Sequence, residues 1–189
     1  MKKSFNIGIG FAVIWIILKL VAFNFQLFLI DLKPFIFANM FFVTLAICIA
    51  LYVKKRAQDG ANMLDDIKTG MASSIIYTVI VSGFIYFYYQ SIYPEFNTSK
   101  ISEMEILLED ESKIEELRKS NPDMENSSSD EIRSQVLRSI SQYYSAKFTM
   151  TISLLGLLIY STLNSLLISL IFRKVIFKDQ SDSSTPSAS

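Results

Sequence analysis

The most unusual ionisable residue in this sequence is Lys19, which interrupts an otherwise uncharged apolar stretch from Phe5 to Ile30. About 14 residues at ~1.5 Å each place it near the centre of a membrane-spanning helix. A central Lys costs roughly 2.5 to 3.5 kcal/mol to insert, and the other apolar stretches offer no Asp or Glu to neutralise it. Its neighbours one turn away, Trp15 and Phe23, are neutral. We expect the side chain to reach an interface, to be buried against backbone carbonyls or Tyr hydroxyls, or to pair with an acid of a partner.

A second group of polar residues lies on the last apolar stretch. Gly156, Tyr160 and Asn164 recur every four residues, which places them on one face of a helix. This row could line a polar path, and helix packing is the interpretation that we favour over a path. Together with Lys19, Tyr160 and Asn164 form the candidate intramembrane polar site.

Small residues also follow a four-residue spacing on the last two apolar stretches. Because no hydrophobic effect drives helices together inside a bilayer, small residues at this spacing allow backbones to approach closely. We expect the two stripes to pack together or to form a dimer contact. Their members are Gly70, Ser74, Thr78 and Ser82, followed by Ser161, Ser165 and Ser169.

Residues for catalysis are scarce. The chain has no His and one Cys, Cys48, which lies within an apolar stretch and behaves there as a small apolar residue. No phosphate-binding loop, dinucleotide fingerprint, zinc spacing or catalytic triad occurs, and we interpret Asp65 and Asp66 as a solvated helix start. We predict no catalytic, cofactor-binding or metal-binding residue, and expect a protein that is not an enzyme and binds no nucleic acid or known small-molecule substrate.

The elements that carry these residues are four long apolar stretches. Three of them, 35–53, 71–93 and 149–172, contain no Asp, Glu, Lys or Arg, and 5–30 contains only Lys19. A helix needs about 20 such residues to cross the bilayer, so we predict an all-α integral membrane protein with four spans. The opening Met-Lys-Lys-Ser resembles a signal peptide, but the apolar run exceeds the roughly 7 to 15 residues of a signal core. We therefore expect 1–178 to form one membrane domain and 179–189 a disordered tail.

The distribution of charge predicts the orientation. Near the spans, nine Lys and Arg lie on the side of the two termini and five on the other side. Positive residues favour the cytoplasm, so both termini are expected there, with 94–148 outside the plasma (inner) membrane. Tyrosines at the outer ends of the third and fourth spans support this orientation, because they are enriched at the membrane boundary. They are Tyr86, Tyr88, Tyr89, Tyr93, Tyr143 and Tyr144.

The acidic segment 94–148 is predicted to form an extracytoplasmic helical hairpin. Ser102 and Glu105 match a capping box at the start of one helix, which Asn121-Pro122 ends. Ser128 and Glu131 match a second box. From there nothing prevents a helix from running into the fourth span.

The third span and its continuation, GMASSIIYTVIVSGFIYFYYQSIYPEF at 70–96, resemble a bacterial family of four-span inner-membrane proteins catalogued as a domain of unknown function. The resemblance rests on the order of the spans and on residues such as Gly70, Pro94, Glu95 and Phe96, and it covers roughly residues 5 to 174. The family often has a Ser-Pro-Gly-like turn before its final span, where this chain has Ser145-Ala146-Lys147. The resemblance implies no functional residues.

These features favour a non-enzymatic scaffold or regulatory subunit that acts in the lipid bilayer as a homo-oligomer or with a membrane-protein partner. The alternative is a small transporter or channel subunit. Four spans enclose little space alone, so this alternative requires an oligomer.

Overall fold

The structure is a computed structural model, and it describes residues 2–27, 33–57 and 62–176. The predicted tail at 179–189 and the connections 28–32 and 58–61 lie outside these ranges. The described residues are helical and contain no strand. In chain order they form α1 (Lys2–Asn24), α2 (Lys33–Ala57), α3 (Met63–Phe87), η1 (Tyr88–Ile92), α4 (Glu95–Leu107), α5 (Glu111–Ser120), η2 (Pro122–Met124), α6 (Ser129–Tyr143), α7 (Ala146–Ile171) and η3 (Phe172–Ile176).

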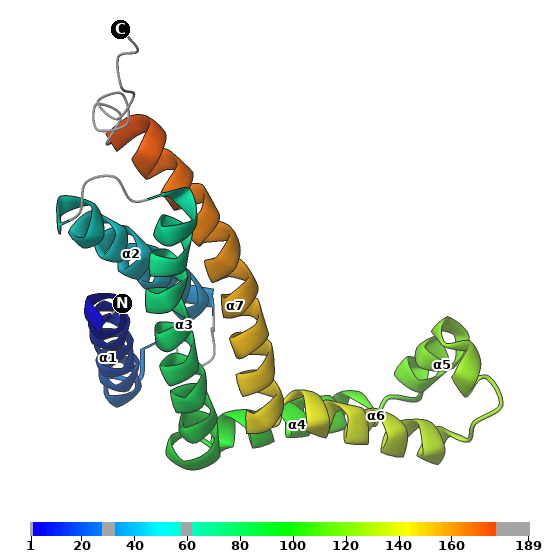
Figure 1. The fold of residues 1–189 in the computed structure, drawn as a ribbon. Helices are drawn as coiled ribbons and strands as arrows, with labels where there is room; N and C mark the ends of the chain where they lie inside the picture. Colours follow the sequence, from blue (N-terminus) through cyan, green and yellow to red (C-terminus); the bar gives the residue numbers. More distant parts are fainter. Residues whose placement is uncertain (1, 28–32, 58–61, 177–189) are drawn as a thin grey trace, which may run out of the picture. The chain divides into compact units, whose positions relative to one another are not determined.

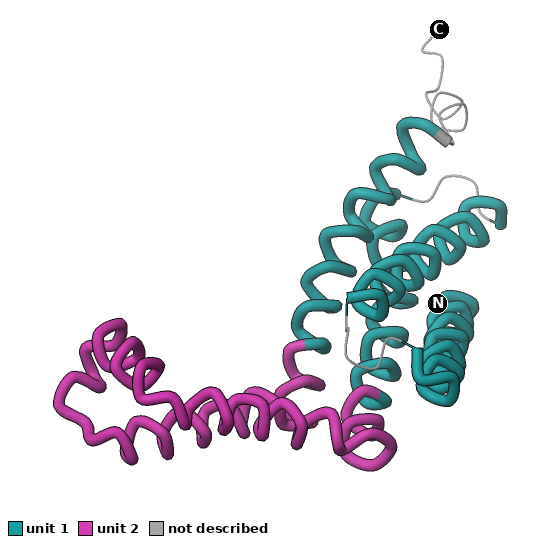
Figure 2. The backbone as a smooth tube through the Cα atoms, turned by 180° about the vertical axis from the view of Figure 1, so that it is seen from behind, with its two compact units in different colours: residues 1–84, 153–189 teal, residues 85–152 magenta. Residues whose placement is uncertain are grey.

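Four of these helical segments are long and apolar enough to cross a membrane: Lys2–Asn24, Lys33–Ala57, Met63–Ile92 and Ala146–Val175. The chain divides into two compact units (Figure 2). Unit 1 comprises 1–84 and 153–189, and unit 2 comprises 85–152. These features fit a multi-span membrane protein.

Unit 1 is a bundle in which α1 packs along α2. Edge-to-face and tilted aromatic pairs join the two helices, with Phe11 6.1 Å from Phe42 and Trp15 6.5 Å from Phe35 between ring centroids. The position along α1 rises from Phe11 to Trp15 as the position along α2 falls from Phe42 to Phe35, so the two helices are antiparallel neighbours. A separate apolar core joins α2 to α7 through Ile47, Leu51, Ile168 and Phe172.

The close approach of α1 to α3 depends on Gly8. A Cβ atom added there would lie 2.2 Å from the Ser73 carbonyl oxygen and 2.3 Å from Ile76 Cγ2. Gly10, two residues later, has open space around it. Gly8 thus allows backbone contact that any side chain would prevent.

The first span ends earlier than the expected 5–30, because α1 stops at Asn24. Gln26 adopts a left-handed conformation with φ 55°. Its N–H donates to Phe23 O at 3.0 Å, and the Leu27 N–H donates to Ala22 O at 2.8 Å. These are the two bonds of a Schellman motif, which closes a helix by satisfying its last carbonyls.

Unit 2 contains three α-helices where two were expected. Ser102 lies inside α4, so the prediction that it caps a helix is wrong: α4 begins directly after Pro94, whose fixed φ suits a helix start. The helix then breaks at Leu108–Asp110, where Asp110 caps α5 by accepting from Ser112 N. Leu108 itself turns into the core of the unit, which consists of Leu108, Ile114, Met124 and Ile132.

The second capping box is confirmed. Ser128 Oγ accepts from Glu131 N, and the Glu131 carboxylate accepts from Ser128 N at 2.8 Å. The helix does not continue into the fourth span, because α6 ends at Tyr143. Ser145 Oγ accepts from Phe148 N at 3.2 Å, so Ser145 caps a new helix, α7.

Candidate functional site

The two polar residues predicted on α7 meet at one residue of α2, Thr44. Asn164 Nδ2 donates to Thr44 Oγ1 at 2.6 Å, and the Tyr160 hydroxyl lies 3.0 Å from the same oxygen. Thr44 donates its own proton to Met40 O at 2.7 Å. A hydroxyl has one proton and two lone pairs, so Tyr160 must be the donor in its bond and Thr44 is saturated. Gly156, the third member of the row, is exposed.

Thr44 was not singled out in the sequence. It is an isolated polar residue within the second span, and only its position opposite Tyr160 and Asn164 gives it a role. A second polar contact of the same kind joins α2 to α3, where the Tyr77 hydroxyl donates to Asn39 Oδ1 at 2.7 Å. In unit 1, these polar side chains connect one helix to another.

Lys19 lies at a different depth from the Thr44 cluster. Its side chain is buried, at 5% exposure, and its Nζ lies 3.7 Å from the ring centroid of Phe35 on α2. Nine residues separate Phe35 from Thr44, which corresponds to about 13 Å along α2. The structure therefore brings Tyr160 and Asn164 together at Thr44 and places Lys19 over an aromatic ring, as a cation–π contact.

The early end of α1 also changes the position of Lys19 along the span. It lies five residues before Asn24, about 7 Å from the helix end at ~1.5 Å per residue. The expectation of a midplane charge assumed a helix through Ile30. Burial raises the cost of the charge, and the contact with the Phe35 ring and the proximity to the helix end offset part of it.

The two stripes of small residues are buried. Every serine and threonine in them is at most 2% exposed, and a Cβ added at Gly70 would lie 3.1 Å from Ser165 Oγ. Ser74 and Ser161 return their hydroxyls to carbonyls of their own helices. Within the described part of the chain, four other hydroxyls have no hydrogen-bond partner: Thr78, Ser82, Ser165 and Ser169.

The largest departure from expectation concerns Asp66, which is 0% exposed. Its interpretation as part of a solvated helix start is wrong. Lys55 Nζ lies 2.9 Å from Oδ2, Lys54 Nζ 3.3 Å from Oδ1, and Arg173 Nε 3.4 Å from Oδ2. Only Asp65 is exposed, one turn from Asn62, whose side chain caps the start of α3.

This ion cluster joins three helical segments: the end of α2, the start of α3 and η3. The position of Asp66 next to basic helix ends follows from packing: α2 ends, α3 begins and α7 ends at the same end of unit 1. Figure 1 shows the first turns of α1 and α3 and the last turns of α2 and α7 directed to the same end of unit 1. Three cations against one carboxylate leave a local excess of positive charge.

The tyrosines near the end of the third span form edge-to-face and tilted ring contacts within unit 2. Tyr88 and Tyr89 are buried, with ring centroids 5.1 Å apart, and Tyr89 lies 5.2 Å from Phe96. Tyr93 completes the group, 6.1 Å from Phe96. These rings therefore contribute to the packing of unit 2 around η1.

The arrangement offers no obvious catalytic chemistry in the residues described. No three His, Cys, Asp or Glu side chains there are grouped so as to hold a metal ion. The polar interactions described above are ion pairs and hydrogen bonds between helices.

A comparison with protein families gives one match. The family described as "Protein of unknown function (DUF4199)" covers residues 6–174. Neither a curated protein nor a solved structure matches the chain.

Proposed function

The chain belongs to this family of proteins of unknown function, and we propose that it acts in the membrane as a non-enzymatic scaffold or regulatory subunit. In this proposal unit 1 is the membrane anchor and the acidic segment 94–148 is the binding element. Both termini lie on the cytoplasmic side of the inner membrane in this proposal, so the acidic segment lies on the extracytoplasmic side.

The observation that carries the proposal is the surface of unit 2. All twelve Asp and Glu between Glu95 and Glu131 are exposed, against seven Lys and Arg in 94–148. The unit nevertheless has its own apolar core and a side-chain bridge, in which Arg133 pairs with Glu111 and donates to Leu108 O at 3.0 Å. A folded segment with a net charge of −5 presents a defined acidic surface.

Two exposed apolar residues lie within this acidic surface. Ile106 is 67% and Leu107 48% exposed at the end of α4, beside the exposed Glu105 and Glu109. Apolar contacts surrounded by charges are typical of protein interfaces, where the apolar centre supplies affinity and the rim supplies specificity. The partner expected here has a basic surface with an apolar centre, on a second copy or another membrane protein.

Site-specific photocrosslinking tests this role. A photoreactive amino acid at Ile106 in the full-length protein should give a discrete crosslinked species in membranes, whereas one at Ile159, exposed on α7, reports background contacts. Replacing Glu105 and Glu109 with Lys should abolish the Ile106 product. A strictly monomeric protein with no product from Ile106 contradicts the proposal.

Cysteine labelling tests the orientation. In a Cys48→Ser background, Ser127→Cys should react with a membrane-impermeant maleimide on intact cells, and Lys174→Cys should react only after permeabilisation. The opposite pattern contradicts an extracytoplasmic acidic segment.

The alternative of a transporter or channel subunit is favoured by the four buried hydroxyls without partners on α3 and α7 and by the Tyr160–Asn164 pair. Proteoliposomes distinguish the two functions. Flux that is lost with Asn164→Leu supports a pathway along α7, and the absence of flux under any ion gradient supports the scaffold.

A further inference from the structure

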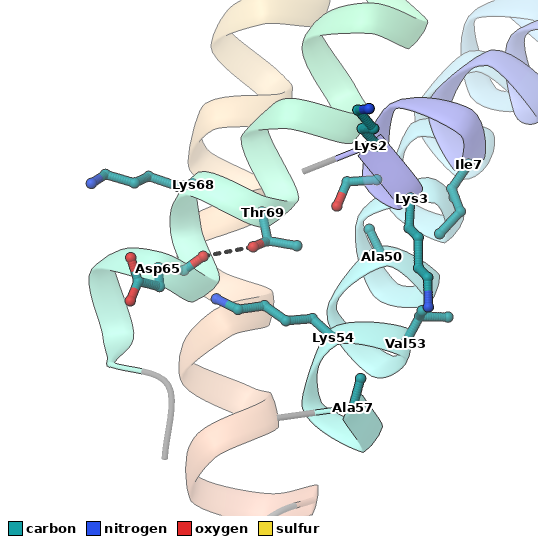
Figure 3. A pocket seen from close by; sticks show the side chains of 11 residues that line it. Lys2, Lys3, Ile7, Ala50, Val53, Lys54, Ala57, Asp65, Lys68 and Thr69 are labelled. Atoms are coloured by element: carbon teal, nitrogen blue, oxygen red, sulfur yellow. Dashed lines mark hydrogen bonds between the residues drawn. The ribbon is translucent and has the colours of Figure 1, made fainter. Parts of the chain in front are cut away.

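The basic ends of three helices line a half-open cavity in unit 1. It has a volume of about 580 Å³ and lies between the first turns of α1, the last turns of α2 and the first turns of α3 (Figure 3). Four of its lining residues are lysines and one is an acid. The full lining is Lys2, Lys3, Ser4, Ile7, Ala50, Val53, Lys54, Ala57, Asp65, Lys68 and Thr69.

The charge of this cavity favours an anion. Its four lysines and one aspartate give a net charge of +3. Lys54, whose side chain is only 15% exposed, also contacts Asp66, but that carboxylate already has Lys55 and Arg173 as further partners. When Lys55, Arg173 and Asp66 are added to the lining residues, the region contains six cations and two carboxylates. The two carboxylates cannot neutralise six cations, so the cavity keeps a positive charge.

The side chains enter the cavity from different helices. In Figure 3, Lys3 extends from α1 toward Val53, and Lys54 extends from α2 toward the first turn of α3. Lys68 points away from the cavity and stands at its rim. Membrane orientation requires basic residues on one side of the membrane, but it does not require them to line the same cavity. Orientation alone therefore does not explain their arrangement.

The apolar part of the lining indicates an amphiphilic ligand. Ile7 and Ala50 lie about one turn further into their helices than Lys3 and Lys54, and Val53 directly precedes Lys54. Ser4 and Thr69 add hydroxyls. A phosphate group at the lysines would therefore continue into an apolar surface formed by membrane-spanning helices. Basic cavities between such helices suit anionic lipid headgroups.

We propose that this cavity binds an anionic phospholipid, with the headgroup phosphate at Lys2, Lys3 and Lys54 and the glycerol and first methylenes against Ile7, Ala50 and Val53. The site is independent of the acidic surface of unit 2. A soluble phosphate ester shares the headgroup chemistry but would leave the apolar surface unused.

Lipid titration of the purified full-length protein in uncharged detergent, followed by native mass spectrometry, tests this proposal. Phosphatidylglycerol should bind at least about tenfold more tightly than phosphatidylcholine. Each basic residue near a membrane surface contributes about fivefold in affinity, so the triple variant K2Q/K3Q/K54Q should lose most of that preference. The matched variant K119Q/R138Q/K147Q, with the same charge change at exposed residues of unit 2, should retain it.

A charge-neutral variant separates the cavity from general surface attraction. Val53→Trp fills the cavity without altering charge and should weaken phosphatidylglycerol binding about tenfold or more, while circular dichroism and size exclusion check its fold. If Val53→Trp does not fold, Ala57→Trp at the exposed helix end replaces it. Wild-type affinity in the lysine triple or in the cavity-filling variant overturns the proposal.

A competition experiment distinguishes binding of a phospholipid headgroup from binding of a soluble phosphate. Inorganic phosphate or glycerol phosphate at equal concentration should leave bound phosphatidylglycerol in place. Displacement at equal concentration, or equal binding of phosphatidylcholine, overturns the assignment to an anionic lipid.

Discussion

Lys55 Nζ lies 2.9 Å from Asp66 Oδ2, and this contact joins the last turn of α2 to the first turn of α3 with both side chains almost fully buried. The adjacent Lys54 and, from η3, Arg173 contact the same carboxylate. One acid therefore holds three segments of unit 1 together at their basic ends.

Removing this carboxylate should destabilise unit 1 strongly. Asp66→Asn leaves Lys55 buried without its counter-ion, and breaking a buried pair from one side costs about 3–5 kcal/mol. The expected result is a large loss of thermal stability in detergent, measured by unfolding-dependent reactivity of Cys48. Asp65→Asn, at the exposed neighbour, should change stability by less than about 0.5 kcal/mol. Equal effects of the two substitutions contradict the role of Asp66.

Gly8 and Gly10 form a matched pair in α1. Gly8→Ala should separate α1 from α3, because its Cβ would overlap the Ser73 carbonyl oxygen at 2.2 Å. Gly10→Ala meets no atom and should stabilise the helix by about 0.5–1 kcal/mol. Disulfide crosslinking between engineered cysteines on α1 and α3 should fall for Gly8→Ala alone. Wild-type crosslinking in this variant would rule out the close approach.

Thr44→Val should weaken the attachment of α7 to α2. The variant keeps the shape of the side chain but removes the acceptor of Tyr160 and Asn164, leaving two polar groups unpaired. Interhelical hydrogen bonds in membranes are worth roughly 0.6 kcal/mol on average, so a loss of about 1–2 kcal/mol is expected from the pair. Thr162→Val, whose exposed hydroxyl bonds only to Leu158 O, is the control. No difference between the two in thermal unfolding would argue against the cluster.

Acid should loosen the start of α6. Hydrogen bonds from the Ser128 backbone and side chain lower the pKa of Glu131 below its usual 4.5. A depressed folded-state pKa means that the stabilisation is present above the usual value and is lost as the pH falls through the lowered one. The protection of the amides at 129–132 from exchange, relative to their intrinsic exchange rate at each pH, should therefore fall in acid. Glu131→Gln, which keeps an acceptor but does not titrate, should remove that pH dependence, and an unchanged profile in this variant would exclude Glu131 as the cause.

Much of the fold follows from local features of the sequence. Long uncharged stretches predict the four spans, and Ser128 with Glu131 predicts the start of α6, because span length and capping depend on neighbouring residues alone. The break at Ser145 and the end of α1 at Asn24 were missed, since a serine cap inside a helix-like pattern and a left-handed Gln26 after a helix have weak local signatures. Asp66 was misinterpreted for a different reason: its partners lie 11, 12 and 107 residues away, and only the packed bundle brings them together.

Lys54 belongs to two environments, because its ammonium is 3.3 Å from Asp66 Oδ1 and its side chain lines the cavity beside α1. A negative group entering that cavity and the Asp66 carboxylate then compete for the same ammonium. By thermodynamic reciprocity, an anion in the cavity weakens the Lys54–Asp66 interaction by the same free energy by which that interaction weakens the binding of the anion. We therefore expect the strength of the Lys54 contact between α2 and α3 to depend on whether an anion occupies the cavity.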